Sequence, residues 1–156
     1  MPISRLVLLS FASILALGSV VALADSPPVV DPAIASMTSE QLVAARQAAM
    51  KEDGMTLKAA FAQTGPEAVA SATTLLKNFT NFPALFKEGS LTDKSHALPI
   101  IWTEFDKFSA IFAKDQESAQ AMLTAAQSGD QAAYLAAAKA IGGSCGECHM
   151  TYRAKE

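Results

Sequence analysis

Apolar residues recur at alternating spacings of four and three residues in three segments of the chain, and this spacing restricts the possible folds. It places apolar side chains along one stripe of an α-helix, the stripe that packs inside a helical bundle. Alanine is abundant and runs of β-branched residues are absent, which also favours helix over strand. The stripes consist of Ala68, Ala72, Leu75, Phe79, Phe82 and Phe86; of Ile101, Phe105, Phe108, Phe112, Ala119 and Met122; and of Tyr134, Ala138, Ile141, Cys145, Cys148 and Tyr152.

A fourth amphipathic helix precedes these three. It begins at Thr38, because Gln41 three residues later completes the pattern of a capping box. Gly54 interrupts it and either kinks the helix or allows a bulky group to approach closely. We expect the helix to end at Gly65. The residues spaced along its apolar face are Leu42, Arg46, Met50, Leu57 and Phe61.

Proline, glycine and aspartate mark the ends of the other helices. Pro66 occupies the first position of the second helix, and Pro83 is expected to end or bend it near Asn81. The third helix is expected to run from Pro99 to a stop at Ser128 and Gly129, after which an aspartate caps the fourth. Four such helices with short connections predict an all-α, antiparallel four-helix bundle.

The first residues are expected to lie outside this bundle. Arg5 precedes an apolar stretch over 6–23, and Ala22-Leu23-Ala24 matches a small-x-small cleavage site. These features predict a secretory signal peptide over 1–24. An uncleaved anchor helix is the alternative, but the abrupt change to polar and proline residues disfavours it. Residues 25–37 are proline-rich and unpatterned, and are predicted to be coil.

The charge of the remaining chain excludes one class of partner. Without residues 1–24 it carries 11 basic and 15 acidic residues, a net charge of −4. A mildly acidic protein has no electrostatic basis for binding nucleic acid, although it can dock a partner that has a basic patch. After cleavage no apolar segment long enough to span a membrane remains. No catalytic acid–base pair is evident in residues 38–156, so we do not expect an enzyme.

The motif Cys145-Gly-Glu-Cys148-His149 carries the chemistry. C-x-x-C-H is the sequence signature of c-type haem attachment. On a helix, residues at i, i+3 and i+4 emerge on one side. The two thiols can therefore form thioethers with the two vinyl groups of a porphyrin, while the imidazole reaches the iron as an axial ligand.

Three other uses of the cysteine pair are weaker. A redox C-x-x-C would start a helix after a strand, whereas this pair lies late in the last helix. A zinc site needs about four ligands, and the only other histidine, His96, is predicted to lie on the surface in a distant loop. A disulfide between residues three apart would close too small a loop to stabilise the fold.

The segments CGECHMTYRAKE, RQAAMK, FPALFKEGS and ALPIIWTEFDKF together resemble the class II c-type cytochromes, the cytochrome c′ group. The resemblance covers nearly all of the chain after the signal peptide, and the C-terminal segment is its most specific part. It implies a periplasmic four-helix bundle with one covalently attached haem c, often a homodimer. By resemblance, Cys145 and Cys148 form the thioethers, His149 is the proximal ligand, and Arg153 is the usual basic residue after the motif.

The same resemblance assigns three residues of the first helix. Arg46 matches an arginine that meets a haem propionate, Gln47 matches a neighbour that also touches the haem, and Met50 faces the open side of the iron. The residues support the role of Arg46, because a cation in an apolar stripe needs an anionic partner. The alternative is that Arg46 lies at the rim and pairs with Glu40 or solvent.

Met50 is either a distal iron ligand or a core residue, because methionine also fills irregular gaps in cores. Met37 and Met55 are rival ligands, but neither shares a helical face with Arg46. Trp102 either walls the haem pocket or packs in the core.

Two haem functions and one other function follow from these alternatives. Ligation by Met50 predicts a six-coordinate electron carrier that serves redox partner proteins. Without that ligand the iron is five-coordinate and open to nitric oxide or carbon monoxide. The third hypothesis, a thiol–disulfide protein without haem, is disfavoured by the position of the motif.

Overall fold

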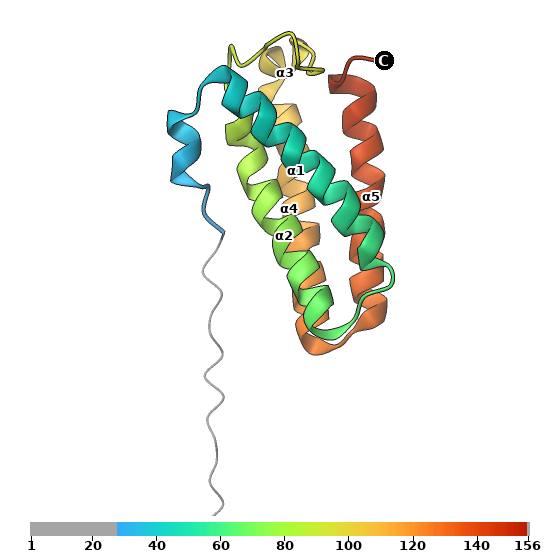
Figure 1. The fold of residues 1–156 in the computed structure, drawn as a ribbon. Coiled ribbons are helices and arrows are strands. Elements are labelled where there is room, and N and C mark those ends of the chain that lie inside the picture. The colour runs from blue at the N-terminus through green and yellow to red at the C-terminus, as the bar shows by residue number, and fades with distance from the viewer. Residues whose placement is uncertain (1–27, 156) are drawn as a thin grey trace, which may run out of the picture.

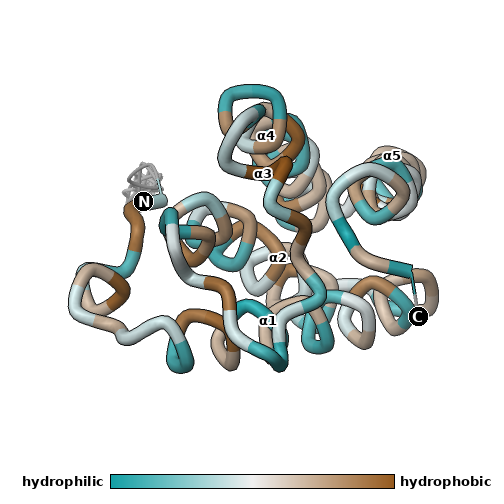
Figure 2. The backbone as a smooth tube through the Cα atoms, turned by 90° about the horizontal axis from the view of Figure 1, so that it is seen from above, coloured by the Kyte–Doolittle hydropathy of each residue, from teal (hydrophilic) through white to brown (hydrophobic). Residues whose placement is uncertain are grey.

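The structure is a computed structural model that describes residues 28–155, so the predicted signal peptide lies outside the described residues. Four long helices run antiparallel to their chain neighbours (Figure 1). Seen from above, α2 lies between α1 and α4, and α5 lies beside α4 (Figure 2). This arrangement confirms the predicted four-helix bundle. The long helices are α1 (Ser39–Ala60), α2 (Gly65–Leu85), α4 (Phe105–Ser128) and α5 (Gln131–Tyr152).

The predicted apolar stripes form the core. Every member is buried except Phe105, which is half-buried, and Cys145, which is exposed. Aromatic rings join the helices: the rings of Phe82 and Phe112 stack at 5.0 Å, and those of Phe86 and Phe108 meet edge to face at 4.7 Å. Such pairs stabilise a core by more than their buried area alone.

Several predicted helix ends are confirmed in atomic detail. Thr38 and Gln41 form the complete capping box at the start of α1. The side chain of Asp130 accepts a hydrogen bond from the Ala133 N–H at the start of α5. Gly129 ends α4 with a φ of 75°, a conformation that costs glycine little.

α1 stops short of its predicted end, and α2 does not end near Asn81, the first of the two alternatives predicted for Pro83. α1 ends at Ala60 rather than Gly65, and the Phe61 side chain is 52% exposed instead of extending the apolar face. α2 continues through Pro83 to Leu85. A proline near the end of a helix removes only one backbone hydrogen bond, and burial of Leu85 in the core offsets that loss.

Two segments contain structure that the sequence did not predict. Within the predicted coil, Pro32–Ser36 forms a 3₁₀ helix, η1, that buries Ile34 against the bundle. The predicted third helix is divided by Glu104, with the short helix α3 (Ile100–Thr103) preceding α4. No helix among residues 28–155 is both long and apolar enough to cross a membrane.

Candidate functional site: a haem pocket between α1 and α5

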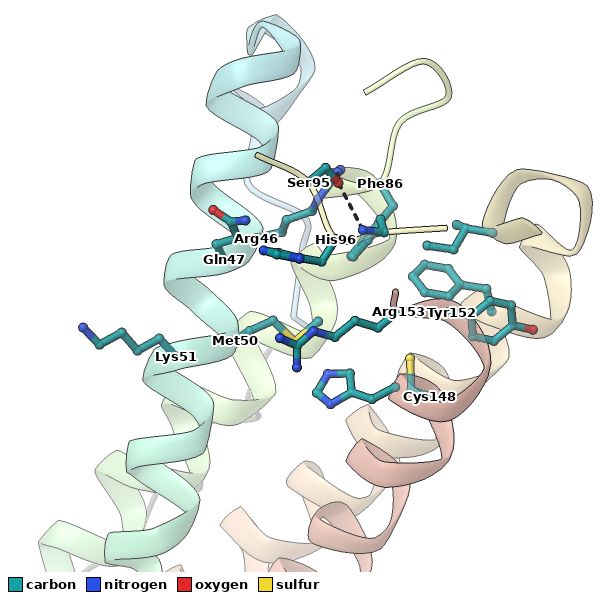
Figure 3. A pocket seen from close by; sticks show the side chains of 14 residues that line it. Arg46, Gln47, Met50, Lys51, Phe86, Ser95, His96, Cys148, Tyr152 and Arg153 are labelled. Atoms are coloured by element: carbon teal, nitrogen blue, oxygen red, sulfur yellow. Dashed lines mark hydrogen bonds between the residues drawn. The ribbon is translucent and has the colours of Figure 1, made fainter. Parts of the chain in front are cut away.

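A large cavity of about 350 Å³ lies at the end of the bundle where α5 ends. α1 contributes Arg46 and Met50 to its wall, and α5 contributes Cys148 and His149. Figure 3 shows Met50 projecting from α1 toward the helix that carries Cys148. The cavity therefore brings together four residues that the sequence analysis selected from opposite ends of the chain.

A second cavity of about 160 Å³ continues toward the middle of the bundle. It shares Met50, Cys148 and His149 with the first cavity and adds Cys145. Apolar side chains form most of its wall, which suits the face of a porphyrin. Both cysteines and the histidine thus face one continuous space, so the residues present fit a covalently attached haem.

The segment between α2 and α3 closes the outer end of the large cavity. It pairs with the end of the chain, because the Leu98 N–H donates to the Tyr152 carbonyl and the Ala154 N–H donates to the His96 carbonyl. His96 is exposed, as predicted, but it also lines the cavity. The sequence did not predict this contact, because the pairing joins residues more than fifty positions apart.

The two cysteines differ in their surroundings. Cys148 is buried, whereas Cys145 is exposed as a residue although it also lines the second cavity. Burial and the neighbouring Asp115 raise the pKa of both thiols, that of Cys148 to about 11. A redox-active C-x-x-C needs a lowered thiol pKa. These surroundings therefore disfavour the thiol–disulfide hypothesis.

His149 lies one turn after Cys145 and lines both cavities. Partial burial and the positive charge of Arg153 lower the pKa of the imidazole. A lowered pKa keeps the ring neutral at physiological pH, and the neutral ring has the lone pair that an iron ligand needs.

Arg46 is 3% exposed and organises the segment that follows α2. Its Nη1 donates to the Leu85 carbonyl and the Ser90 hydroxyl, and its Nη2 donates to the Ser90 carbonyl and the Ser95 hydroxyl. The guanidinium also lies 4.6 Å from the centre of the Phe86 ring. All these partners are neutral, so the alternative of a rim position with Glu40 is not supported. Pairing with a propionate stays a prediction.

Replacing Arg46 with leucine should destabilise the fold and lower the haem potential. The change strands buried oxygens at Leu85 and Ser90, so we expect the free energy of unfolding to fall by about 3 kcal/mol. Loss of a cation near the haem favours the ferric state and lowers the midpoint potential. Urea titration and redox titration measure the two effects, with exposed Lys58→Leu as the control. If the variant is destabilised but its midpoint potential is unchanged, the role of Arg46 is only to stabilise the segment after α2.

Gln47 and Trp102 have different places. Gln47 lines the large cavity and donates from Nε2 to the Lys94 carbonyl at 2.7 Å, so it also anchors the closing segment. The Trp102 indole donates to the Phe86 carbonyl at 2.9 Å, and the side chain packs against the core without lining either cavity. Of its two predicted roles, the structure supports the core role.

Met50 is separated from its rivals by position. It lines both cavities, whereas Met55 is 59% exposed and Met37 packs against the core near the start of α1. Neither rival contributes to the two cavities. Among the three candidates for the distal ligand, Met50 is therefore placed to reach a haem.

Two buried carboxyl groups in the wall of the second cavity, hereafter the inner cavity, were not predicted from the sequence. Asp53 on α1 is 8% exposed and Asp115 on α4 is 4% exposed. The signal was present, because each aspartate occupies a position where the four–three spacing calls for an apolar residue: Asp53 between Met50 and Leu57, and Asp115 after Phe112.

The bundle, the cavity and the C-x-x-C-H motif together define a c-type cytochrome. A family model described as Cytochrome C′ matches residues 41–153. Cytochrome c′ from Rhodospirillum rubrum is 34% identical over 128 residues, which cover 80% of this chain and 84% of that protein. Cytochrome c-556 from Agrobacterium fabrum is 44% identical over 87 residues, 56% of this chain and 58% of that relative.

Solved structures show the same fold. Cytochrome c′ from Thermochromatium tepidum matches with a TM-score of 0.70 at 22% identity, covering 76% of this chain and 99% of that one. Ferric cytochrome c prime from Alcaligenes xylosoxidans matches with a TM-score of 0.68 at 24% identity, covering 76% and 98%. The chain belongs to the cytochrome c′ family, a standard example of the up-and-down four-helix bundle, and binds haem c covalently.

Proposed function

We propose that this cytochrome is a periplasmic one-electron carrier whose iron is ligated by His149 and Met50. The observation that carries the proposal is the position of Met50, which shares both cavities with His149 but comes from a different helix. A thioether is a soft, neutral ligand that favours ferrous iron and raises the potential. Six-coordinate iron also changes little between its two oxidation states, which suits electron transfer.

In this proposal the chain's own residues hold and shield the cofactor, which supplies the redox chemistry. Cys145 and Cys148 fix the porphyrin to α5. The buried aromatic side chains of α2 and α4, such as Phe82 and Phe112, exclude water from the inner cavity. Arg46 and Gln47 hold the segment that closes the outer end.

The second candidate function is binding of a diatomic gas. A solved structure related to this chain, at 24% identity, is a nitric oxide complex of a cytochrome c prime variant from Alcaligenes xylosoxidans. Met50 is the residue on which this alternative depends, because it lines both cavities. If it does not ligate, the iron has an open side that can take up nitric oxide or carbon monoxide.

The remaining parts of the proposal concern location and partners. Export by the predicted signal peptide over 1–24 would bring the protein to the periplasm. Redox proteins are the expected partners, and the protein itself is not expected to be an enzyme.

A related structure is described as a cytochrome c′ with ligand-controlled dimer dissociation, and we propose a homodimer for this chain also.

One absorption spectrum decides between the two candidates. We expect the purified ferric protein to be low-spin, with the weak near-infrared charge-transfer band of methionine–iron coordination. We also expect the ferrous protein to bind carbon monoxide slowly and weakly, because Met50 must first dissociate. A high-spin spectrum with rapid carbon monoxide binding would favour the gas-binding function instead.

A further inference from the structure

The inner cavity contains a carboxyl group with an unused acceptor atom. Asp53 Oδ1 accepts a hydrogen bond of 2.7 Å from Asn78 Nδ2, but Asp53 Oδ2 is buried and has no hydrogen-bond partner. Asn78 also donates to Glu52 Oε2 at 2.9 Å. The free oxygen belongs to a residue that lines the same cavity as Cys145 and His149.

A second buried carboxyl faces the same space from α4. Asp115 Oδ1 accepts a hydrogen bond from the Ser144 hydroxyl, one residue before the first cysteine of the motif. The groups that act on Asp53 are Asn78 on α2, Glu52 on its own helix and Asp115 on α4. From α5, the Cys145 thiol and the His149 imidazole line the same cavity. None of these is a cation, so nothing among them compensates a negative charge on Asp53.

An uncompensated buried carboxylate is costly, and the usual response is to take up a proton. Burial raises the pKa of Asp53 to about 7, the Asn78 hydrogen bond opposes this, and the charges of Glu52 and Asp115 add to it. Burial also raises the pKa of Asp115, against the hydrogen bond from Ser144. The pair thus resembles functional carboxyl groups more than structural ones.

From this arrangement we propose that Asp53 is a proton-binding site coupled to the haem: it binds a proton when the iron is reduced and releases it when the iron is oxidised. One electron enters the iron from a redox partner, and one proton enters the carboxylate from water. Asp115 disfavours a second negative charge in the cavity, so it raises the pKa of Asp53 and moves the pH range of the coupling upward. This role is independent of the proposed electron-carrier function, because a gas-binding haem also changes its oxidation state.

The coupling follows from charge. Reduction removes one positive charge from the haem, so a neighbouring carboxylate loses part of its stabilisation and its proton affinity rises. By thermodynamic reciprocity, protonation of Asp53 must favour the ferrous state by the same factor. The midpoint potential should therefore fall as the pH rises between the pKa of Asp53 in the oxidised protein and its pKa in the reduced protein. Within that window, each pH unit changes the ratio of ferrous to ferric haem at fixed potential by up to about tenfold.

Redox titration of the haem-loaded protein from pH 5 to pH 9 tests the proposal. Asp53→Asn should remove this pH dependence and hold the potential near the wild-type acid limit, because the amide mimics the protonated carboxyl. Asp115→Asn should move the window to lower pH. The matched control is Glu52→Gln, which removes an exposed acid that shares the Asn78 donor. It should keep the pH dependence and at most move it to lower pH, because the charge of Glu52 also raises the pKa of Asp53.

Infrared difference spectra of the wild type provide a readout that needs no variant. Reduction near pH 7 should produce a carboxylic-acid carbonyl band that shifts in heavy water. If Asp53→Asn does not fold, absence of this band still overturns the proposal. The proposal is overturned if no such band appears, or if Asp53→Asn retains the wild-type pH dependence. A pH dependence lost equally in Glu52→Gln would assign it to surface charge and also overturn the proposal.

Discussion

Replacement of both Cys145 and Cys148 with alanine should abolish covalent haem attachment. If each cysteine supplies one thioether, as proposed, a single replacement leaves one covalent bond and the double replacement leaves none. His149 remains in place, and the double variant can retain at most haem held by coordination and packing. Denaturing electrophoresis with a haem stain should show bands for the wild type and both single variants, and no band for the double variant.

The cysteine variants also test whether the motif attaches haem or serves in thiol–disulfide exchange. Raised thiol pKa values make both cysteines poor nucleophiles toward disulfides, so we expect no thiol–disulfide exchange activity in any form of the protein. Haem staining that persists in the double variant would show that the porphyrin is attached elsewhere.

Replacement of Met50 with leucine should convert low-spin iron to high-spin iron. Leucine has a similar volume, so the core keeps its packing while the sulfur ligand is lost. The near-infrared band should disappear and the potential should fall. If the sulfur leaves wild-type iron about 1% of the time, the apparent affinity for carbon monoxide should rise by about a hundredfold.

Met55→Leu is the matched control, because Met55 lies on the same helix but is 59% exposed. It should leave the spin state, the potential and the carbon monoxide affinity unchanged. A wild type that is already high-spin, and that Met50→Leu does not alter, would reduce Met50 to a core residue and move gas binding to first place.

The fold was largely predictable, because local periodicity determined it. The spacing of apolar residues identified four helices, and the capping signals at Thr38 and Asp130 located two helix starts. The end of α1 and the passage of α2 through Pro83 were not predictable in the same way. They depend on which side chains find space in the core, as the burial of Leu85 and the exposure of Phe61 show.

The residues of the site were predictable where a sequence motif or a shared helical face identified them. C-x-x-C-H placed the expected haem attachment on α5, and helical spacing placed Met50 and Arg46 on one face of α1. The partners of Arg46 were not predictable, because its hydrogen bonds reach residues 39 to 49 positions away, at the end of α2 and in the irregular segment that follows. Asp53 and Asp115 were visible as interruptions of a regular pattern, but only the structure shows that they share a cavity.

The most direct test of the account is the intact mass of the wild-type protein, produced in a host with a c-type cytochrome maturation system and measured after denaturation. We predict the mass of the polypeptide from residue 25 onward plus one haem. After proteolysis, the haem should remain on the peptide that contains Cys145 and Cys148. A polypeptide mass without haem, or a haem on a different peptide, would contradict the account.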